Sequence, residues 1–311
     1  MSSKIIRFLR NRDFILLFGV VCGLFLDRGT LWTQPLVLPA LGVVMTLSTM
    51  GISGSAFRPP GALIRPFFAG VFMSYGVLSG VILIMGKLLI HDDALWSGFV
   101  ILAAVPPAIA IIPFADFLGG NRFYALIGTM GGYLGGLLLM PFTALLFLRT
   151  SISNPSSILK VIIVLLVIPF VLSRVLIWTK LEERIAPYKG TITNWSFFLV
   201  VYTVVGLNQE HFFRNPVGLI PVVLIAVATT FILGFVIEWI GKIAKLDQEI
   251  TTSLVLLGTL KNYGLAAGIA LALFGKETAL PATVSTIFMI IYIIWLNFKT
   301  GLGSKGKVTS Q

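Results

Sequence analysis

Long apolar stretches, separated by short polar or turn-forming segments, follow one another along almost the whole chain. A helix needs about 20 largely apolar residues to cross the hydrocarbon core of a bilayer. The stretches that approach or exceed this length are 13–28, 33–54, 65–90, 95–119, 122–148, 157–178, 192–209, 216–243, 249–275 and 278–298. The pattern therefore predicts an all-α membrane protein with ten transmembrane helices.

The connections between these stretches are short. Proline, glycine and asparagine mark joints at 58–61, 119–121, 153–155 and 215–216, where such residues favour turns. A further connector, residues 180–189, is strongly polar and is predicted to be a loop between two spans.

Ten helices divide into two groups of five, residues 1–150 and 151–311. Because five is an odd number, the second group would enter the membrane in the orientation opposite to that of the first. We therefore predict an inverted repeat.

The fourth stretch of each group is interrupted near its middle. Pro106 and Pro107 break the first, because adjacent prolines remove two backbone donors and clash with the preceding turn. The second is interrupted between Gly258 and Gly264, where glycine, threonine and asparagine, all poor helix formers, surround a lysine. Interrupted helices at matching places in inverted halves indicate the substrate site of a transporter. The freed backbone groups must face a cavity or a ligand rather than lipid.

Composition supports the membrane assignment. Hydrophobic residues make up 57% of the chain and charged residues 11%, against about 25% charged in a soluble domain. The net charge of +11 does not indicate nucleic-acid binding, because no basic patch with interleaved aromatics and no zinc-type spacing is present. The single cysteine, Cys22, excludes an intrachain disulfide.

The distribution of lysine and arginine predicts the orientation. With both termini in the cytoplasm, the inner regions hold Lys4, Arg7, Arg10, Arg12, Arg58, Arg65, Arg122, Lys180, Arg184, Lys189, Lys242, Lys245, Lys299, Lys305 and Lys307. The outer regions hold Arg28, Lys87, Arg149, Lys160, Arg214 and Lys276. Cytoplasmic loops of membrane proteins carry such an excess of basic residues. We therefore predict a multi-pass protein of the cell membrane with both termini inside.

The first apolar stretch could also belong to a signal peptide, because basic residues precede it. Asp27 and Arg28 follow the stretch directly, and no small-residue cleavage site is evident. A first spanning helix is the better interpretation.

Lys261 is the most informative single residue, because its position predicts an ammonium near the bilayer centre. Placing a charge there costs about 2.5–3.5 kcal/mol on insertion scales. One interpretation is a fixed cation that attracts an anionic substrate or exchanges protons. The other is structural, with the ammonium binding the carbonyl end of a half-helix or pairing with Asp116. Both roles are compatible.

Three further residues near the interruptions are candidate substrate contacts. Asn262 offers donors and an acceptor to a substrate or, alternatively, caps a helix; Thr259 allows the same two interpretations. Ile109, beside the proline pair, is a candidate substrate contact. Pro106 and Pro107 are expected to shape the break rather than to bind.

Other charged residues in the stretches have simpler interpretations. Asp116 is followed closely by Arg122 and is expected at a solvated helix end. Glu238 and Lys242 are four residues apart and predict an ordinary helical ion pair.

Glycine repeats at four-residue spacing in the fifth stretch, at Gly128, Gly132 and Gly136 and again at Gly131 and Gly135. Small residues at this spacing let transmembrane helices approach closely. The repeat therefore predicts tight packing beside the interrupted helices.

No catalytic or metal-binding constellation is recognisable. The histidine-bearing segments 91–93 and 210–211 supply too few ligands for a metal, and they are expected in solvated outer loops. A phosphate-binding glycine loop, a nucleophile elbow and paired catalytic carboxylates are all missing from the sequence. We predict neither enzymatic activity nor a cofactor.

Two motifs resemble the bile acid:sodium symporter family. Residues 261–272, KNYGLAAGIALA, are similar to the signature of its ninth span, and 106–110, PPAIA, with Gly120-Asn121 downstream, to its fourth. The resemblance covers nearly the whole chain. It implies a core domain of spans three to five and eight to ten, with crossed discontinuous helices. A panel domain of spans one, two, six and seven would move against this core.

The sodium-site positions of that family differ here. The resemblance places its oxygen ligands at the positions of Ser74, Ile111, Ile112, Ala125, Thr129, Leu257 and Lys261. Only Thr129 is retained, and Ser74 is a weaker polar substitute, so both become candidate substrate contacts. A lysine about 4 Å from a sodium ion would repel it by about 4 kcal/mol at an effective dielectric near 20. We therefore expect no sodium at these positions.

The leading hypothesis is a sodium-independent secondary transporter of small organic anions, such as bile-acid-like or other carboxylates, in which Lys261 replaces the sodium charge. Transport coupled to protons, transport coupled to a counter-substrate and uncoupled transport are all compatible with this hypothesis. The alternative is a non-transporting membrane receptor or sensor that retains the transporter fold. A polytopic lipid-modifying enzyme ranks last, because it lacks a catalytic constellation.

Overall fold

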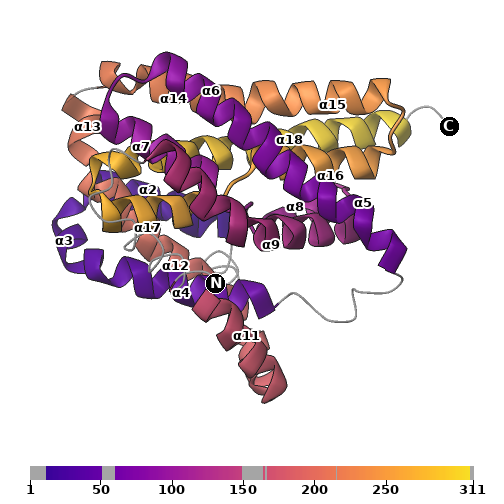
Figure 1. Cartoon of the computed structure of the whole chain (residues 1–311), viewed down its shortest axis with the longest axis horizontal. Helices are drawn as coiled ribbons and strands as arrows, with labels where there is room; N and C mark the ends of the chain where they lie inside the picture. Colours follow the sequence, from indigo (N-terminus) through magenta and orange to yellow (C-terminus); the bar gives the residue numbers. More distant parts are fainter. Residues whose placement is uncertain (1–11, 51–59, 149–163, 165–166, 215, 309–311) are drawn as a thin grey trace.

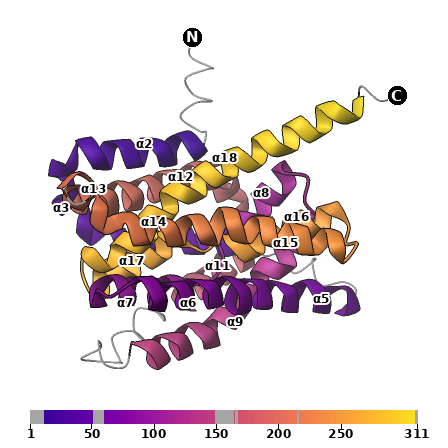
Figure 2. The same cartoon turned by 90° about the horizontal axis from the view of Figure 1, so that it is seen from above.

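The computed structural model describes residues 12–50, 60–148, 164, 167–214 and 216–308, and every named element in these ranges is a helix (Figure 1). Figure 2 shows that most of these helices run roughly along one direction. The fold class predicted from the apolar pattern, an all-α protein, is confirmed.

Within the described ranges, six helical stretches are long and apolar enough to cross a membrane: Asp27–Leu47, Gly61–Leu89, Arg122–Phe147, Leu181–Leu207, Val217–Ile243 and Glu277–Thr300. Shorter apolar helices cover Phe14–Phe25, Asp93–Ala104, Ile168–Trp178 and Tyr263–Leu273. A helix therefore overlaps each of the ten predicted stretches, and six of these helices have the length of a full span.

The helices follow one another with the bounds α2 (Arg12–Phe25), α3 (Thr30–Thr33), α4 (Val37–Met50), α5 (Pro60–Val71), α6 (Ser79–Leu89), α7 (Asp93–Ala104), α8 (Ile111–Phe117), α9 (Arg122–Phe147), α11 (Ile168–Trp178), α12 (Leu181–Leu207), α13 (Gln209–Arg214), α14 (Ile220–Val227), α15 (Leu233–Ile243), α16 (Gln248–Thr259), α17 (Tyr263–Leu273) and α18 (Leu280–Val308). Two π-helical segments, Phe72–Leu78 and Ala228–Ile232, join α5 to α6 and α14 to α15.

The helices pack in two sets. In the first, α12 lies against α2 and α4, and α11 packs on α4. In the second, α5 packs on α9, α15 on α16, and α7 on α6, α9 and α17. Figure 1 shows α4 and α11 on one side of the molecule and α6, α14 and α15 on the opposite side. Because α12 also contacts α17, it joins the first set to the interrupted helices of the second.

The predicted loop at 180–189 is wrong, because all but its first residue belong to α12. Lys180 adopts a left-handed conformation, with a φ of 59°, and forms the turn that separates α11 from α12. Glu182 and Glu183 lie in the first turn of α12, where the helix dipole favours negative charge. The polar residues that suggested a loop therefore stabilise the start of a long helix.

Both interruptions predicted from the sequence are present. Helix α7 ends at Ala104 and α8 begins at Ile111, while α16 ends at Thr259 and α17 begins at Tyr263. Each apolar stretch is thus divided into two short helices joined by non-helical residues.

The outer faces of the helices are apolar. Trp32 and Trp178 are 83% and 85% exposed, and Leu138 is 77% exposed. Large apolar side chains with this exposure suit a surface surrounded by lipid. Together with the six long apolar helices, they support a membrane protein.

The repeated glycines of α9 provide close packing, as their spacing predicts. A Cβ at Gly131 would lie 2.4 Å from the Phe67 carbonyl oxygen of α5, and one at Gly132 would lie 2.4 Å from the ring of Pro107. Helix α9 therefore approaches α5 on one side and the first interruption on the other.

Candidate functional site

The two interruptions meet and hydrogen-bond to each other. Ala108 donates its backbone N–H to the Leu260 carbonyl at 3.2 Å, and Asn262 donates its N–H to the Pro106 carbonyl at 3.0 Å. This reciprocal pair forms an antiparallel bridge between Pro107 and Lys261. Backbone groups that the breaks free from helical bonding thus satisfy one another, as a buried membrane site requires.

Lys261 is fully buried at this crossing. Its ammonium donates a hydrogen bond to the Val105 carbonyl at 2.8 Å and lies 4.1 Å from the centre of the Tyr75 ring. Val105 directly follows the last residue of α7, so the ammonium lies at the carbonyl end of a half-helix, where the helix dipole is negative. In this conformation the Lys261 side chain has no contact with solvent.

Asn262 caps the second half-helix. Its side-chain oxygen accepts a hydrogen bond from the Leu265 N–H at 3.1 Å, at the start of α17. The side-chain amide donates to the Tyr133 hydroxyl at 3.2 Å. The capping role considered for Asn262 is therefore present, while its backbone belongs to the crossing and the residue lines the adjacent cavity.

We expect Asn262→Ala to destabilise the protein by about 0.5–2 kcal/mol, because it removes the cap of α17. Asn262→Ser should recover most of this loss, because serine also caps helices well but cannot replace the amide donor to Tyr133. Thermal unfolding of both variants in detergent measures the difference. Equal unfolding temperatures for the two variants would contradict a capping contribution.

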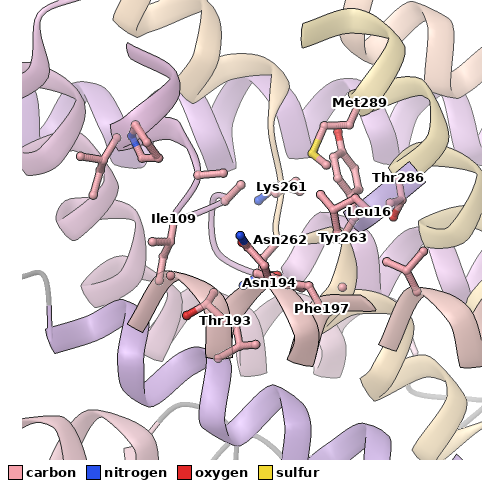
Figure 3. A pocket seen from close by; sticks show the side chains of 18 of the residues that line it. Leu16, Ile109, Thr193, Asn194, Phe197, Lys261, Asn262, Tyr263, Thr286 and Met289 are labelled. Carbon is pink, nitrogen blue, oxygen red and sulfur yellow. The ribbon is translucent and has the colours of Figure 1, made fainter. Parts of the chain in front are cut away.

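A cavity of about 480 Å³ lies between the crossing and α12. Its wall consists of Leu16, Val44, Ala108, Ile109, Ala110, Ile112, Pro113, Arg122, Leu126, Ala186, Lys189, Gly190, Thr193, Asn194, Phe197, Val201, Lys261, Asn262, Tyr263, Gly264, Thr286 and Met289. Figure 3 shows Thr193, Asn194 and Phe197 facing the crossing at Lys261 and Asn262. Ligand pockets commonly have this size and this mixture of apolar and polar lining.

The predicted substrate contacts divide into two groups. Lys261, Asn262 and Ile109 line the cavity, whereas Thr259, Ser74 and Thr129 are not among its lining residues. The Thr259 hydroxyl donates to the Val255 carbonyl at 2.7 Å, within its own helix. The structure therefore brings three of the six candidates to the cavity.

Ser74 and Thr129 are buried away from the cavity. Neither hydroxyl has a hydrogen-bond partner among the described residues, and the same is true of the Tyr75 hydroxyl. Buried hydroxyls normally have a partner in the protein or an ordered water. Their placement favours internal hydration or helix packing over direct contact with cavity contents.

The residues predicted to break the helices have different positions. Pro106 and Pro107 lie in the first interruption, as expected. Gly258 and Gly264 instead lie just inside α16 and α17, because the second interruption covers only residues 260–262. These two glycines allow neighbouring side chains to approach the helices closely. A Cβ at Gly258 would lie 2.6 Å from Met73 and Ile237, and a Cβ at Gly264 would lie 3.0 Å from Phe197.

The other predicted ion pairs form at helix ends. Asp116 pairs with Arg122 at 3.1 Å, and both side chains are more than half exposed, so Asp116 is not the partner of Lys261. Glu238 pairs with Lys242 at 3.0 Å as predicted, and Lys299 also binds Glu238. Across the described ranges no group of three metal-ligating side chains occurs.

Sequence reasoning missed the contribution of α12 to the site. Lys189, Thr193 and Phe197 recur every four residues and line the cavity from one face of this helix. The assignment of 180–189 to a loop separated Lys189 from the other two. Extending the four-residue spacing of Thr193 and Phe197 back to Lys189 would have shown that the three residues share one helix face.

The comparisons with known proteins agree with this architecture. Residues 31–298 match the model of the SBF-like CPA transporter family, which is related to the bile acid:sodium symporters. The uncharacterized protein YbaS of Bacillus subtilis (strain 168) is 22% identical over 281 residues, 88% of this chain and 90% of that protein. Because the family match covers most of the sequence, the chain belongs to the SBF-like CPA transporter family.

Proposed function

We propose that the protein is a sodium-independent secondary transporter of small organic anions that works by alternating access. The cavity beside the crossing carries this proposal. Its described lining includes three cations, Arg122, Lys189 and Lys261, and no carboxylate. A concave site with cations alone attracts anions, because its walls concentrate one sign of charge.

An inverted ten-span repeat is part of the proposal. Helices overlap all ten predicted stretches, and the interruptions of the fourth and ninth stretches bond to each other. The π-helical segments add support: Phe72 is 11 residues after Gly61, and Ala228 is 11 residues after Val217. Corresponding irregularities in the third and eighth stretches are expected of two repeats with one ancestor.

Alternating access follows from the two packing sets. The set of α2, α4, α11 and α12 would form the panel, and the set that holds the crossing would form the core. The cavity lies between them, so rocking of one against the other would open and close it. Arg122, at the open side, is exposed and is predicted to be cytoplasmic, which favours an inward-open conformation.

Three features support sodium independence. Leu257 and Ile111 are fully buried, and neither offers an oxygen at positions where the resemblance expects ligands. The Lys261 ammonium already occupies the carbonyl end of α7, where a cation is electrostatically favoured. A sodium ion close to it would be repelled.

Uptake into proteoliposomes tests the proposal. We expect uptake of radiolabelled 6-phenylhexanoate at the same rate in sodium and in choline buffers, and little uptake of the neutral 6-phenylhexanamide beyond empty liposomes. Because the described lining of the cavity includes basic side chains and no carboxylate, the anionic 6-phenylhexanoate should be the better substrate. Uptake that a sodium gradient stimulates, or equal protein-dependent uptake of acid and amide, would contradict the proposal.

A further inference from the structure

One face of α12 runs the length of the cavity. It presents Ala186, Lys189, Thr193, Phe197 and Val201, which are spaced three or four residues apart. Exposure falls along this face, from exposed Ala186, through half-buried Lys189, Thr193 and Phe197, to buried Val201. The start of α12 therefore marks the mouth of the cavity and Val201 its inner end. At about 1.5 Å per residue, Lys189 and Phe197 are roughly 12 Å apart along the helix.

The three cations of the cavity differ in whether a protein group binds them directly. Lys261 is bonded to the Val105 carbonyl, and Arg122 is paired with Asp116. Lys189 has no hydrogen bond and no ion pair within 4.0 Å among the residues that the structure describes. The Glu182 carboxylate, seven residues earlier on α12, acts on this ammonium electrostatically but forms no ion pair with it within 4.0 Å. A half-buried cation without a direct partner is unusual, because partial desolvation disfavours charge unless a counter-ion lies against it. Lys189 is therefore the cation that remains available for a ligand.

Deeper in the cavity the lining is mainly apolar. Leu16, Val44, Phe197, Val201, Tyr263 and Met289 supply the apolar part of the lining, to which the polar Asn194, Asn262 and Thr286 also belong. Burial of an apolar ligand surface against such walls is favourable by about 25 cal/mol per Å². The cavity thus has a cationic mouth on α12 and an apolar interior that reaches the crossing.

We infer that Lys189 holds the head group of a single-headed amphipathic anion, whose apolar body extends inward past Phe197 towards the crossing. The inference rests on the proposed function and assigns the orientation and the head-group ligand of the same cavity. A carboxylate or sulfonate would accept a charge-assisted hydrogen bond from the Lys189 ammonium. Because Lys189 belongs to α12, the bound anion would connect the two packing sets directly.

Binding to the purified full-length protein tests the head-group assignment. The probes are 6-phenylhexanoate and 6-phenylhexanamide, which differ only in charge and in the head group. We expect the wild-type protein to bind the acid more tightly than the amide, and Lys189→Gln to reduce this preference at least tenfold. The preference that remains is the contribution of the Lys261 charge. Arg184→Gln is the matched control, because it removes one positive charge from the same helix outside the cavity lining and should keep the preference.

The apolar contacts test the orientation. The acid 6-phenylhexanoate should bind more tightly than the shorter phenylacetate, and Phe197→Ala should reduce this gain in affinity. It should reduce the gain from phenylacetamide to 6-phenylhexanamide equally, while leaving the preference for acid over amide intact. A preference for the acid that Lys189→Gln leaves unchanged overturns the inference, as does a failure of every probe to bind. A preference that disappears in Lys261→Gln but is unchanged in Lys189→Gln also overturns it, because the head group would then lie at the crossing.

The two proposals can fail separately. Lys189-dependent binding of the acid without uptake into proteoliposomes would sustain the inference and contradict transport. Sodium-independent uptake that Lys189→Gln leaves unchanged would sustain transport and contradict the inference.

Discussion

Lys261→Gln is expected to reduce anion uptake at least tenfold while the protein remains folded. At an effective dielectric near 20, a unit positive charge about 10 Å from the anion contributes roughly 1.7 kcal/mol, which is more than a tenfold change in binding. Glutamine removes the charge but keeps a donor that is able to bond the Val105 carbonyl. Uptake of 6-phenylhexanoate into proteoliposomes measures the effect.

The folded state should tolerate the loss of this charge. A lysine at the centre of a membrane helix costs about 2.5–3.5 kcal/mol on insertion scales. Removing the donor from the Val105 carbonyl costs about 1–3 kcal/mol. These terms oppose each other, so Lys261→Met, which removes both the charge and the donor, should change stability by no more than about 2 kcal/mol. A large loss of uptake without a large loss of stability would identify the charge as functional.

Lys245→Gln provides the control for uptake, because Lys245 is exposed and does not line the cavity. It lies in a left-handed conformation, with a φ of 53°, that glutamine adopts about as readily as lysine. Lys245→Gln should transport like the wild type. Wild-type uptake by Lys261→Gln would contradict an electrostatic role for Lys261.

The positions of the helix interruptions could be predicted from the sequence, because their causes are local. Adjacent Pro106 and Pro107 prevent a continuous helix in any tertiary context. The poor helix formers around Lys261 act in the same way. The partner of the lysine could not be predicted, because Val105 is 156 residues away in sequence and offers only a backbone carbonyl, which every residue possesses.

The start of α12 could not be predicted from hydropathy. Hydropathy treats Glu182, Glu183 and Lys189 as loop residues. Acidic side chains are nevertheless favourable in the first turn of a helix, and a lysine can cover apolar surface with its stem while its ammonium stays in water. The error in this boundary removed Lys189 from the predicted site. The burial of Ser74 and Thr129 outside the cavity was likewise beyond sequence reasoning, because it depends on how α9 and the π-helical segment pack.

Gly70→Ala is expected to cause one of the largest losses of stability in the protein. A Cβ at Gly70 would lie 2.0 Å from the Gly128 carbonyl oxygen and 2.4 Å from its Cα, so α5 and α9 would have to separate. The obstacle is backbone, which cannot rotate away as a side chain can. Gly128 itself packs against Leu257 of α16, so the displacement would reach the helix that leads to the crossing. Overpacking of this kind costs about 1–3 kcal/mol and occasionally more, and we expect the upper end.

Gly80→Ala is the matched control, because Gly80 belongs to the same helical stretch, Gly61–Leu89, and a Cβ there has no neighbour within 4 Å among the described residues. Alanine is favoured over glycine in a helix by about 0.8–1.0 kcal/mol, so Gly80→Ala should leave the unfolding temperature unchanged or raise it. The same substitution thus has opposite expected signs at two positions ten residues apart. Thermal unfolding and the yield of monodisperse protein in detergent measure both variants. If Gly70→Ala unfolded at or above the wild-type temperature, the close approach of α5 to α9 would not be a source of stability.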